Sequence, residues 1–419
     1  LVASEPLVRQ PVCIEFDDRG RLWVIQYLQY PNPEGLKRVQ VDRFSRTKYD
    51  RVPEPPPRGP KGADRITILE DVDGDGRMDQ GRNFANGLNL ATGLAFGHHG
   101  VFVLNVPYLL FYPDRDRNDV PDADPEVLLT GFGMEDAHSV ANSLTWGPDG
   151  WLYGCQGSTV TAQIRGIEFQ QGVWRYHPQT REFELFCEGG GNAWGLDFDR
   201  FGRLLYSTNY GGFVLVHGVQ GGYFVKSFAK HGALHNPHTY GFFDHAPHAG
   251  FRGGHVTVGG IVYQADAFPP FFRDKYIAGD LLGHGVYWHD VQPRGSTVQT
   301  AHGGELLTAS DTRCLRGRLA RRADGTPRSR RRVGSHQRPH LSDRPARHAA
   351  IKAVRFGQGH DRGTAGSAHS SQSVVRAARA AGAGPPRRRV GGGTSDRAIH
   401  TVWGRAHRFG VVLDAAVAG

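Results

Sequence analysis

A short pattern of apolar and polar positions recurs four times in the first half of the chain. Counted from its first aliphatic residue, each copy has an aromatic residue at +2, Gly at +6 and an apolar residue at +8. Apolar residues that alternate in this way face one side of a strand, and the Gly-containing turn between them predicts a tight hairpin. The copies are CIEFDDRGRLWV (13–24), GLAFGHHGVFV (93–103), SLTWGPDGWLYG (143–154) and GLDFDRFGRLLYS (195–207).

The spacing of these copies predicts the fold. They lie 80, 50 and 52 residues apart, and repeats of about 40–50 residues with one hairpin each are typical of β-propeller blades. The long first interval contains the Pro-rich stretch 51–62, which we expect to be a surface excursion and not a strand. Residues 172–190 predict two strands around the turn HPQT, and residues 259–291 predict a further blade. We expect an all-β propeller; a stack of unrelated hairpins is the alternative.

Charge divides the chain into two parts. Residues 313–419 contain 22 Arg, one Lys and five Asp, a net charge of +18, whereas the first 312 residues carry −9. The arginine-rich stretch 311–334 has the composition of an arm that binds nucleic acid. The part of the chain before it is acidic and rich in aromatic residues, which is not the composition of such an arm. We expect the function of the protein to lie in this earlier part.

Cysteine usage and hydropathy exclude several kinds of site. No CxxC pair is present, so the chain encodes neither a thiolate zinc site nor a CxxCH haem attachment. We expect free core thiols, with one disulfide as the alternative. No signal peptide and no transmembrane run appear, and because the chain begins without Met we expect an N-terminal truncation. The four cysteines are Cys13, Cys155, Cys187 and Cys314.

Two acidic loops have the spacing of oxygen ligands around calcium. In EDVDGDGRMD (70–79) four aspartates lie at positions 1, 3, 5 and 9 when the loop is counted from Asp71. Gly76 takes position 6, where the chain turns sharply around the ion. DRDRNDVPD (114–122) repeats this spacing, but Asp119 replaces the Gly, and Arg115 and Arg117 partly neutralise the site. Solvated acidic turns are the alternative. The predicted ligands are Asp71, Asp73, Asp75 and Asp79, and Asp114, Asp116, Asn118 and Asp122.

Histidines supply the candidate proton acceptors. His138 follows Glu135 and Asp136 just before a predicted strand, and a neighbouring carboxylate orients an imidazole and raises its basicity, as a general base needs. A second group, in the His-rich stretch 231–255, includes His255 with Arg252 and is expected to line the central mouth of the propeller. Histidines that only hydrogen-bond are the alternative in both places.

Several of these stretches resemble a known family. TGFGMEDAHSVANSLTWGPDGWLYGCQGS (130–158), GVWRYHP, GNAWGLDFDRFG and GGIVYQADAFPPFFRDKYIAGD are similar to the membrane-bound dehydrogenase family of planctomycete β-propellers. The last of them also resembles soluble quinoprotein glucose and sorbosone dehydrogenases. The resemblance covers about residues 5–312. It implies a six-bladed propeller in the periplasm or outside the cell, holding pyrroloquinoline quinone (PQQ) and a carbohydrate or alcohol substrate, with a cytochrome c as electron acceptor.

Carried over by position, the resemblance is incomplete. The catalytic histidine of the quinoproteins falls at Ser139, one residue after His138. The Arg–Asn pair that contacts the quinone falls at Gly191 and Asn192, so only the Asn matches. In such enzymes the histidine takes the proton of the substrate hydroxyl while hydride passes to the quinone.

The resemblance also gives another reading of the basic tail. Relatives continue past Thr312 with a sixth hairpin of the GPDG type, whereas this chain changes to an Arg-, Ala- and Gly-rich mixture, as GC-rich DNA gives when it is read in the wrong frame. We therefore expect a propeller domain over 1–312, with about five blades intact and the sixth incomplete, then a frameshifted, disordered tail over 313–419 and no nucleic-acid binding. The expected function is a sugar or alcohol dehydrogenase, with calcium; the alternative is a non-catalytic propeller that binds carbohydrate or protein around structural calcium.

Overall fold

The computed structural model describes residues 2–43, 46–226, 243–252, 257–283, 285–308 and 352–353. They all belong to one compact unit of the chain. Strands dominate this part of the chain, and its one helix is the single 3₁₀ turn η1 (Pro270–Phe272). The predicted all-β class is confirmed.

Two antiparallel sheets come first along the chain. Sheet 1 has the order β1-β2-β5-β6 and sheet 2 the order β10-β9-β8-β7, so in both the chain folds back strand by strand. Their strands are β1 (Pro11–Phe16), β2 (Leu22–Gln26), β5 (Asp64–Glu70), β6 (Gln80–Leu88), β7 (Ala91–Gly97), β8 (Gly100–Asn105), β9 (Tyr108–Pro113) and β10 (Glu126–Thr130).

Three further sheets follow, and each contains at least three strands that fold back antiparallel, one after another, in the same way. Sheet 3 has the order β11-β12-β15-β16-β20, sheet 4 the order β17-β18-β19, and sheet 5 the order β21-β25-β24-β23-β22, with β26 paired to β25. Their strands are β11 (Asn142–Trp146), β12 (Leu152–Gln156), β15 (Gly172–Tyr176), β16 (Phe183–Gly190), β17 (Leu196–Phe198), β18 (Leu204–Ser207), β19 (Leu215–Gly218), β20 (Tyr223–Lys226), β21 (His248–Ala249), β22 (Thr257–Val262), β23 (Tyr276–Asp280), β24 (Gly285–Arg294), β25 (Thr297–Thr308) and β26 (Lys352–Ala353).

The four recurring patterns form the first hairpin of four sheets, as predicted. They give the pairs β1–β2, β7–β8, β11–β12 and β17–β18. In three copies the Gly at +6 closes the turn with a positive φ, at Gly20 (78°), Gly150 (82°) and Gly202 (77°). In the second copy His98 and His99 take the positive φ values, 52° and 59°, which makes a tight two-residue turn of the kind that matches strand twist.

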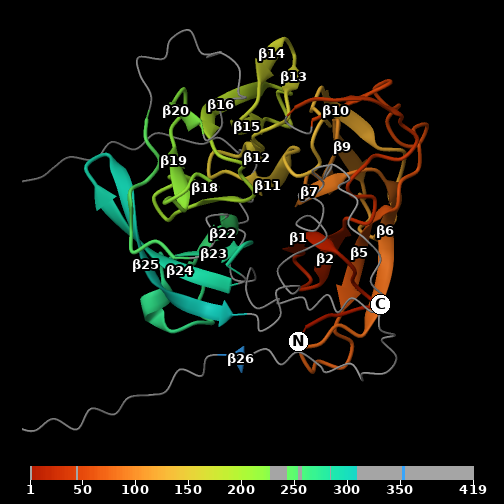
Figure 1. The fold of residues 1–419 in the computed structure, drawn as a ribbon. Helices are drawn as coiled ribbons and strands as arrows, with labels where there is room; N and C mark the ends of the chain where they lie inside the picture. The colour runs from red at the N-terminus through yellow and green to blue at the C-terminus, as the bar shows by residue number, and fades with distance from the viewer. Residues whose placement is uncertain are drawn as a thin grey trace, which may run out of the picture. The chain divides into compact units, whose positions relative to one another are not determined.

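The five sheets pack around a common centre, as propeller blades do (Figure 1). Their first strands contact one another in succession: β1 with β7, β7 with β11, β11 with β17 and β17 with β22. Apolar side chains fill the space between neighbouring sheets, for example Ile66 with Val103 between sheets 1 and 2, and Leu215 with Val262 between sheets 4 and 5. Each such fully buried side chain stabilises the fold by about 1.5–3 kcal/mol. A sixth blade stays a prediction.

Several segments depart from the repeating plan. Between β2 and β5 the chain makes a separate hairpin, β3 (Arg38–Val41) with β4 (Thr47–Tyr49), and then the Pro-rich stretch 51–62, which contains no strand, as predicted. Strands β13 (Ala162–Ile164) and β14 (Ile167–Phe169) form another separate hairpin. Strands β20 and β21 add in parallel to the outer edges of sheets 3 and 5, because the chain leaves sheet 4 after only three strands.

The meander gives the sheets two chemically different ends. In an antiparallel sheet that folds back strand by strand, the first and third connections lie at one end. The second connection and the links between sheets lie at the other. The end that holds the first and third connections is called the acidic end (residues 17–21, 71–79 and 114–122). The opposite end is called the histidine end (residues 27–30, 131–141, 157–161 and 191–194).

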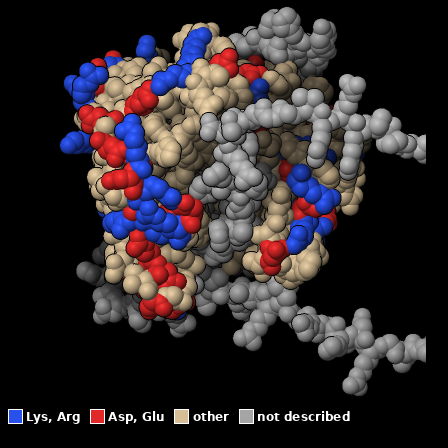
Figure 2. All heavy atoms as spheres, turned by 180° about the vertical axis from the view of Figure 1, so that it is seen from behind, with Lys and Arg blue, Asp and Glu red and all other residues tan. Residues whose placement is uncertain are grey.

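The described residues also bear on the remaining expectations. Cys155 and Cys187 are free, buried thiols, as predicted, while Cys314 and the tail from 313, apart from β26, lie outside the described residues. The described chain contains no helix that is long and apolar enough to cross a membrane. Basic and acidic side chains are interspersed along the surface in Figure 2, and the absence of nucleic-acid binding stays a prediction.

Candidate functional site

His138 lies at the histidine end, in the link that leads into β11. Its Nδ1 is 2.7 Å from Asp136 Oδ1, and the same oxygen accepts the backbone N–H of His138 at 3.0 Å. The other carboxylate oxygen accepts a hydrogen bond from the Thr159 hydroxyl at 2.5 Å. Asp136 is therefore held on both oxygens, and it holds the ring of His138 in one orientation.

Tyr30 supplies a hydroxyl to the other ring nitrogen. It comes from the connection after β2, and its hydroxyl oxygen lies 2.5 Å from His138 Nε2 across 108 residues of sequence. The two rings meet edge to face at 5.3 Å. Because Asp136 accepts the proton on Nδ1, Nε2 carries the lone pair, and the Tyr30 hydroxyl donates to it.

The backbone of His138 is anchored by the next link between sheets. Its carbonyl accepts hydrogen bonds from Trp194 Nε1 at 2.7 Å and from Asn192 Nδ2 at 2.9 Å. Asn192 Oδ1 in turn accepts the backbone N–H of Ser158 at 3.1 Å. Asn192, the predicted cofactor contact, thus has partners at both ends of its side-chain amide and positions the histidine loop.

The two acidic residues of the loop have pKa shifts of opposite direction. Burial raises the pKa of Asp136, but the hydrogen bonds and charge of His138 and the bond from Thr159 outweigh it, so the net pKa is lowered. Its neighbour Glu135 is half-buried, and desolvation raises the pKa of that carboxyl. Asp136 is therefore the ionised partner that an imidazole base needs.

A cavity of about 860 Å³ lies beside this loop. The β3–β4 hairpin walls it on one side through Arg46, Lys48 and Tyr49, and the loop walls it on the other through Gly133 and Glu135. The backbone N–H of Thr47 donates to the Glu135 carbonyl at 2.6 Å, which ties the hairpin to the histidine loop. The insertion after β2 thus contributes both Tyr30 and one cavity wall to the histidine end.

The first acidic loop has the scaffold of a cation site. Asp71 accepts the backbone N–H groups of Gly74 and Gly76 at 2.8 Å each, and Asp79 accepts that of Val72 at 3.0 Å. One oxygen each of Asp71, Asp73 and Asp79 lies within 4.8 Å of the others, a group that does not include Asp75. Positions 1, 3 and 9 of the predicted ligand set are brought together, and calcium stays a prediction.

The second acidic loop repeats this scaffold residue by residue. Asp114 accepts the backbone N–H of Asp119, as Asp71 does that of Gly76, and Asp122 accepts that of Arg115 at 2.9 Å. Asp114, Asp116 and Asp122 form the corresponding group of oxygens within 4.8 Å. Asn118, the fourth predicted ligand, donates from Nδ2 to Asp116 at 2.8 Å.

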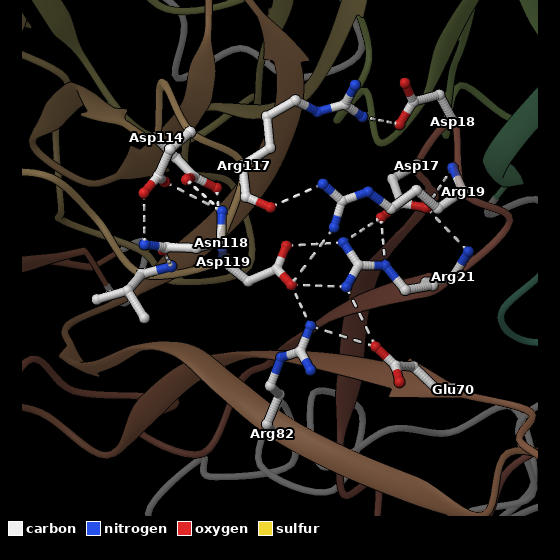
Figure 3. A network of polar contacts seen from close by, with 12 residues as sticks. Asp17, Asp18, Arg19, Arg21, Glu70, Arg82, Asp114, Arg117, Asn118 and Asp119 are labelled. Carbon is white, nitrogen blue, oxygen red and sulfur yellow. Dashed lines mark hydrogen bonds and ion pairs between the residues drawn. The ribbon is translucent and has the colours of Figure 1, made fainter.

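The Asp119 side chain ties this loop to sheet 1. Its carboxylate accepts two hydrogen bonds of 2.7 Å from Arg21, and Arg82 also pairs with it (Figure 3). Arg21 further contacts Asp17 at 2.7 Å and Glu70 at 3.1 Å. The hydrogen bond from Arg21 lowers the pKa of Asp119, more than burial raises it.

The structure brings together only some of the predicted site residues. His138 and Asn192 share one cluster. Arg252 is exposed and lies near His302 in sheet 5, outside that cluster. His255 lies outside the described residues. Tyr30 was missed, because no signal in the sequence joins it to His138, whereas Asp136 was identifiable from its position two residues before the histidine.

Comparison with known proteins gives a family for the chain. The model described as a domain of unknown function, DUF7133, matches residues 1–325. The chain belongs to the DUF7133 family. The match extends past the predicted boundary at 312, and the family description names no activity. No curated protein matches this DUF7133 member.

Solved structures resemble it only distantly. The PQQ-bound aldose sugar dehydrogenase of Streptomyces coelicolor matches with 13% identity and a TM-score of 0.43, covering 72% of this chain and 85% of that one. An inactive virginiamycin B lyase of Staphylococcus aureus with quinupristin matches with 10% identity and a TM-score of 0.36, covering 72% of each chain. At these values the comparisons support no conclusion about substrate or cofactor.

Proposed function

We propose that this DUF7133 member is a dehydrogenase-like propeller that binds a carbohydrate or alcohol at the histidine end, where His138 accepts a hydroxyl proton. The observation that carries the proposal is the chain of contacts from Asp136 through His138 to the Tyr30 hydroxyl. An oriented imidazole whose free lone pair already receives an O–H bond is the arrangement that a general base requires.

The residues define a route for the proton. A substrate hydroxyl donates to the Tyr30 oxygen or replaces it at His138 Nε2, and the imidazole becomes an imidazolium. The ionised Asp136 stabilises that cation, because its oxygen already accepts the Nδ1 proton. The neighbouring cavity, which is lined by Glu135 of the loop and not by His138, offers room for the rest of a polar molecule, with Arg46, Lys48 and Tyr49 as hydrogen-bond donors.

The positions that the resemblance assigns to a quinone do not fit one. A Cβ at Gly191 would lie 2.4 Å from Asn209 Oδ1 and 2.6 Å from Thr208 Oγ1, so an arginine has no room there. Asn192 is engaged with the His138 carbonyl and the Ser158 N–H. No step through PQQ follows from these residues. This misfit favours a second candidate, a non-catalytic propeller that binds carbohydrate.

Turnover and binding assays separate the two candidates. The full chain is given PQQ, Ca²⁺, a dye acceptor and a panel of sugars and alcohols, and binding is followed in parallel by calorimetry. Turnover that falls at least 100-fold in His138→Ala, with His177→Ala at the opposite end unchanged, supports the dehydrogenase. Binding without turnover supports the second candidate, and neither binding nor turnover contradicts both.

A further inference from the structure

Three histidines, of which His289 is buried and the other two are half-buried, meet on one face of sheet 5. The pairing of β24 with β25 sets His289 opposite His302, and the parallel addition of β21 sets His248 beside Thr300. The ring centroids of His248 and His289 are 5.2 Å apart, and those of His289 and His302 are 5.8 Å apart. Val291, two residues after His289, packs toward sheet 4, so the cluster lies on the side of sheet 5 that faces its neighbour.

Each of these histidines has a buried nitrogen that finds no hydrogen-bond partner among the described residues. The atoms are His248 Nε2, His289 Nδ1 and His302 Nδ1. His289 is only 3% exposed, so solvent does not reach it freely. A buried polar atom without a partner costs about 1–3 kcal/mol, and native proteins contain few. Three on neighbouring rings indicate that something is bound among them.

The network around His248 identifies its unpartnered nitrogen as a lone-pair donor. Thr300 Oγ1 donates its proton to the Pro247 carbonyl at 3.2 Å. The same oxygen lies 2.9 Å from His248 Nδ1 and therefore accepts a proton from it. With the proton on Nδ1, Nε2 has only its lone pair. Imidazoles that bind metals are commonly oriented by such a bond from the other ring nitrogen.

Burial keeps all three rings neutral, which is the form that binds a metal ion. It lowers the pKa of His248 to about 4 and that of His289 to about 3, and the neighbouring histidines lower both further. Burial also lowers the pKa of His302, and the charge of Arg252 adds to this while Glu305 opposes it. Arg252, which was expected to line the central mouth, thus acts electrostatically on His302 of this cluster.

We propose that His248, His289 and His302 form a binding site for a divalent transition-metal ion of the Zn²⁺ or Co²⁺ type. Two imidazoles that share a tetrahedral ion at about 2.1 Å have centroids about 5 Å apart, and two of the three ring pairs, at 5.2 and 5.8 Å, are near this value. Nitrogen ligands select these ions over the calcium expected in the acidic loops. The nitrogens do not yet converge within 4.8 Å as the acidic oxygens do, so at least one ring turns on binding, and water completes the coordination.

Titration with Co²⁺ tests the site on the full chain after chelator treatment. The expected result is one ion per chain with the visible d–d bands of four-coordinate cobalt, displaced by Zn²⁺. His289→Gln and His302→Ala are each expected to weaken binding at least tenfold. The matched control is His217→Ala, because His217 also contacts β25, through Thr297 at 3.1 Å, but lies outside the cluster. This variant is expected to bind Co²⁺ as tightly as the wild type.

A second variant keeps the test decisive if a histidine substitution prevents folding. Thr300→Val keeps all three rings and removes the hydrogen bond that orients His248 together with the one to the Pro247 carbonyl, and circular dichroism of the metal-free protein verifies its fold. A loss of affinity in Thr300→Val supports the site. Absence of the four-coordinate cobalt spectrum in the wild type, or unchanged affinity in both His302→Ala and Thr300→Val, overturns the proposal.

Discussion

The two ends of the sheets pair their aspartates with different partners. At the acidic end, Asp119 pairs with the guanidinium groups of Arg21 and Arg82, which stay charged at every pH that the protein meets. At the histidine end, Asp136 pairs with the His138 imidazole and the Thr159 hydroxyl, and an imidazole, unlike a guanidinium, can exchange a proton. Both carboxylates have lowered pKa values, yet only the second can take part in proton transfer.

This difference shows that an acidic residue with a shifted pKa does not by itself mark a functional site. What distinguishes Asp136 from Asp119 is the partner: a fixed cation makes the Asp119 carboxylate a structural link between sheets 1 and 2, whereas Asp136 holds the ring that we propose as a base. Variants at the acidic end should therefore change stability and leave chemistry alone, while variants at the histidine end should do the reverse.

The largest effect is expected from Arg21→Ala. The substitution leaves Asp119 and Asp17, whose side chains are only 5% and 8% exposed, without their main cation, and breaking a buried ion pair in this way costs about 3–5 kcal/mol. Urea unfolding measures the loss. Arg58→Ala is the control, because its pair with Glu54 is 76% and 66% exposed and is worth at most about 1 kcal/mol. Equal stability of the two variants would remove the contrast between the ends.

Asp136→Asn is expected to be the counterpart at the histidine end. An asparagine keeps the shape but does not stabilise the imidazolium, so activity on the substrate that the panel identifies should fall about 10³–10⁴-fold. The free energy of unfolding should change by less than about 1.5 kcal/mol, the size of a single hydrogen bond. Nitrogen NMR shifts of the His138 ring, which report the protonated nitrogen, check the cause. An unchanged ring signal together with full activity would show that the pair is structural.

The sequence predicted the scaffold far better than the site. The hairpins were identifiable because a strand and a Gly turn are encoded within about a dozen neighbouring residues, as in 143–154. Asp136 and His138 are also neighbours and were found together. Tyr30 joins them across 108 residues, through an insertion whose path no local pattern specifies. His248, His289 and His302 meet for the same reason: strand register, not spacing, brings them together.

Acid should reveal the same contrast with a smaller effect. The folded-state pKa of Asp119 is lowered, so its contribution is complete above the ordinary aspartate pKa of about 3.9 and is lost as pH falls through the lower folded value. The free energy of unfolding of the wild type should therefore drop below about pH 4. In Asp119→Asn, which is already less stable at pH 7, this part of the drop should be missing. Parallel acid profiles of the two proteins would assign the loss to other carboxylates.

Calcium should give the smallest effect and should separate the two acidic loops. At 71–79 the three grouped carboxylates have only Arg77 beside them in the loop, whereas at 114–122 Arg115 pairs with Asp122 and Arg117 with Asp18. An exposed site of millimolar affinity or better stabilises by about 1.4–2.7 kcal/mol when the ion is at 10 to 100 times its Kd. We expect Ca²⁺, and not an equal concentration of Mg²⁺, to raise Tm. Asp73→Asn should abolish the shift, and Asp116→Asn, at the same position of the second loop, should leave most of it. A shift lost equally in both variants would mean that the arginines do not distinguish the loops, and that the acidic end holds two equivalent cation sites.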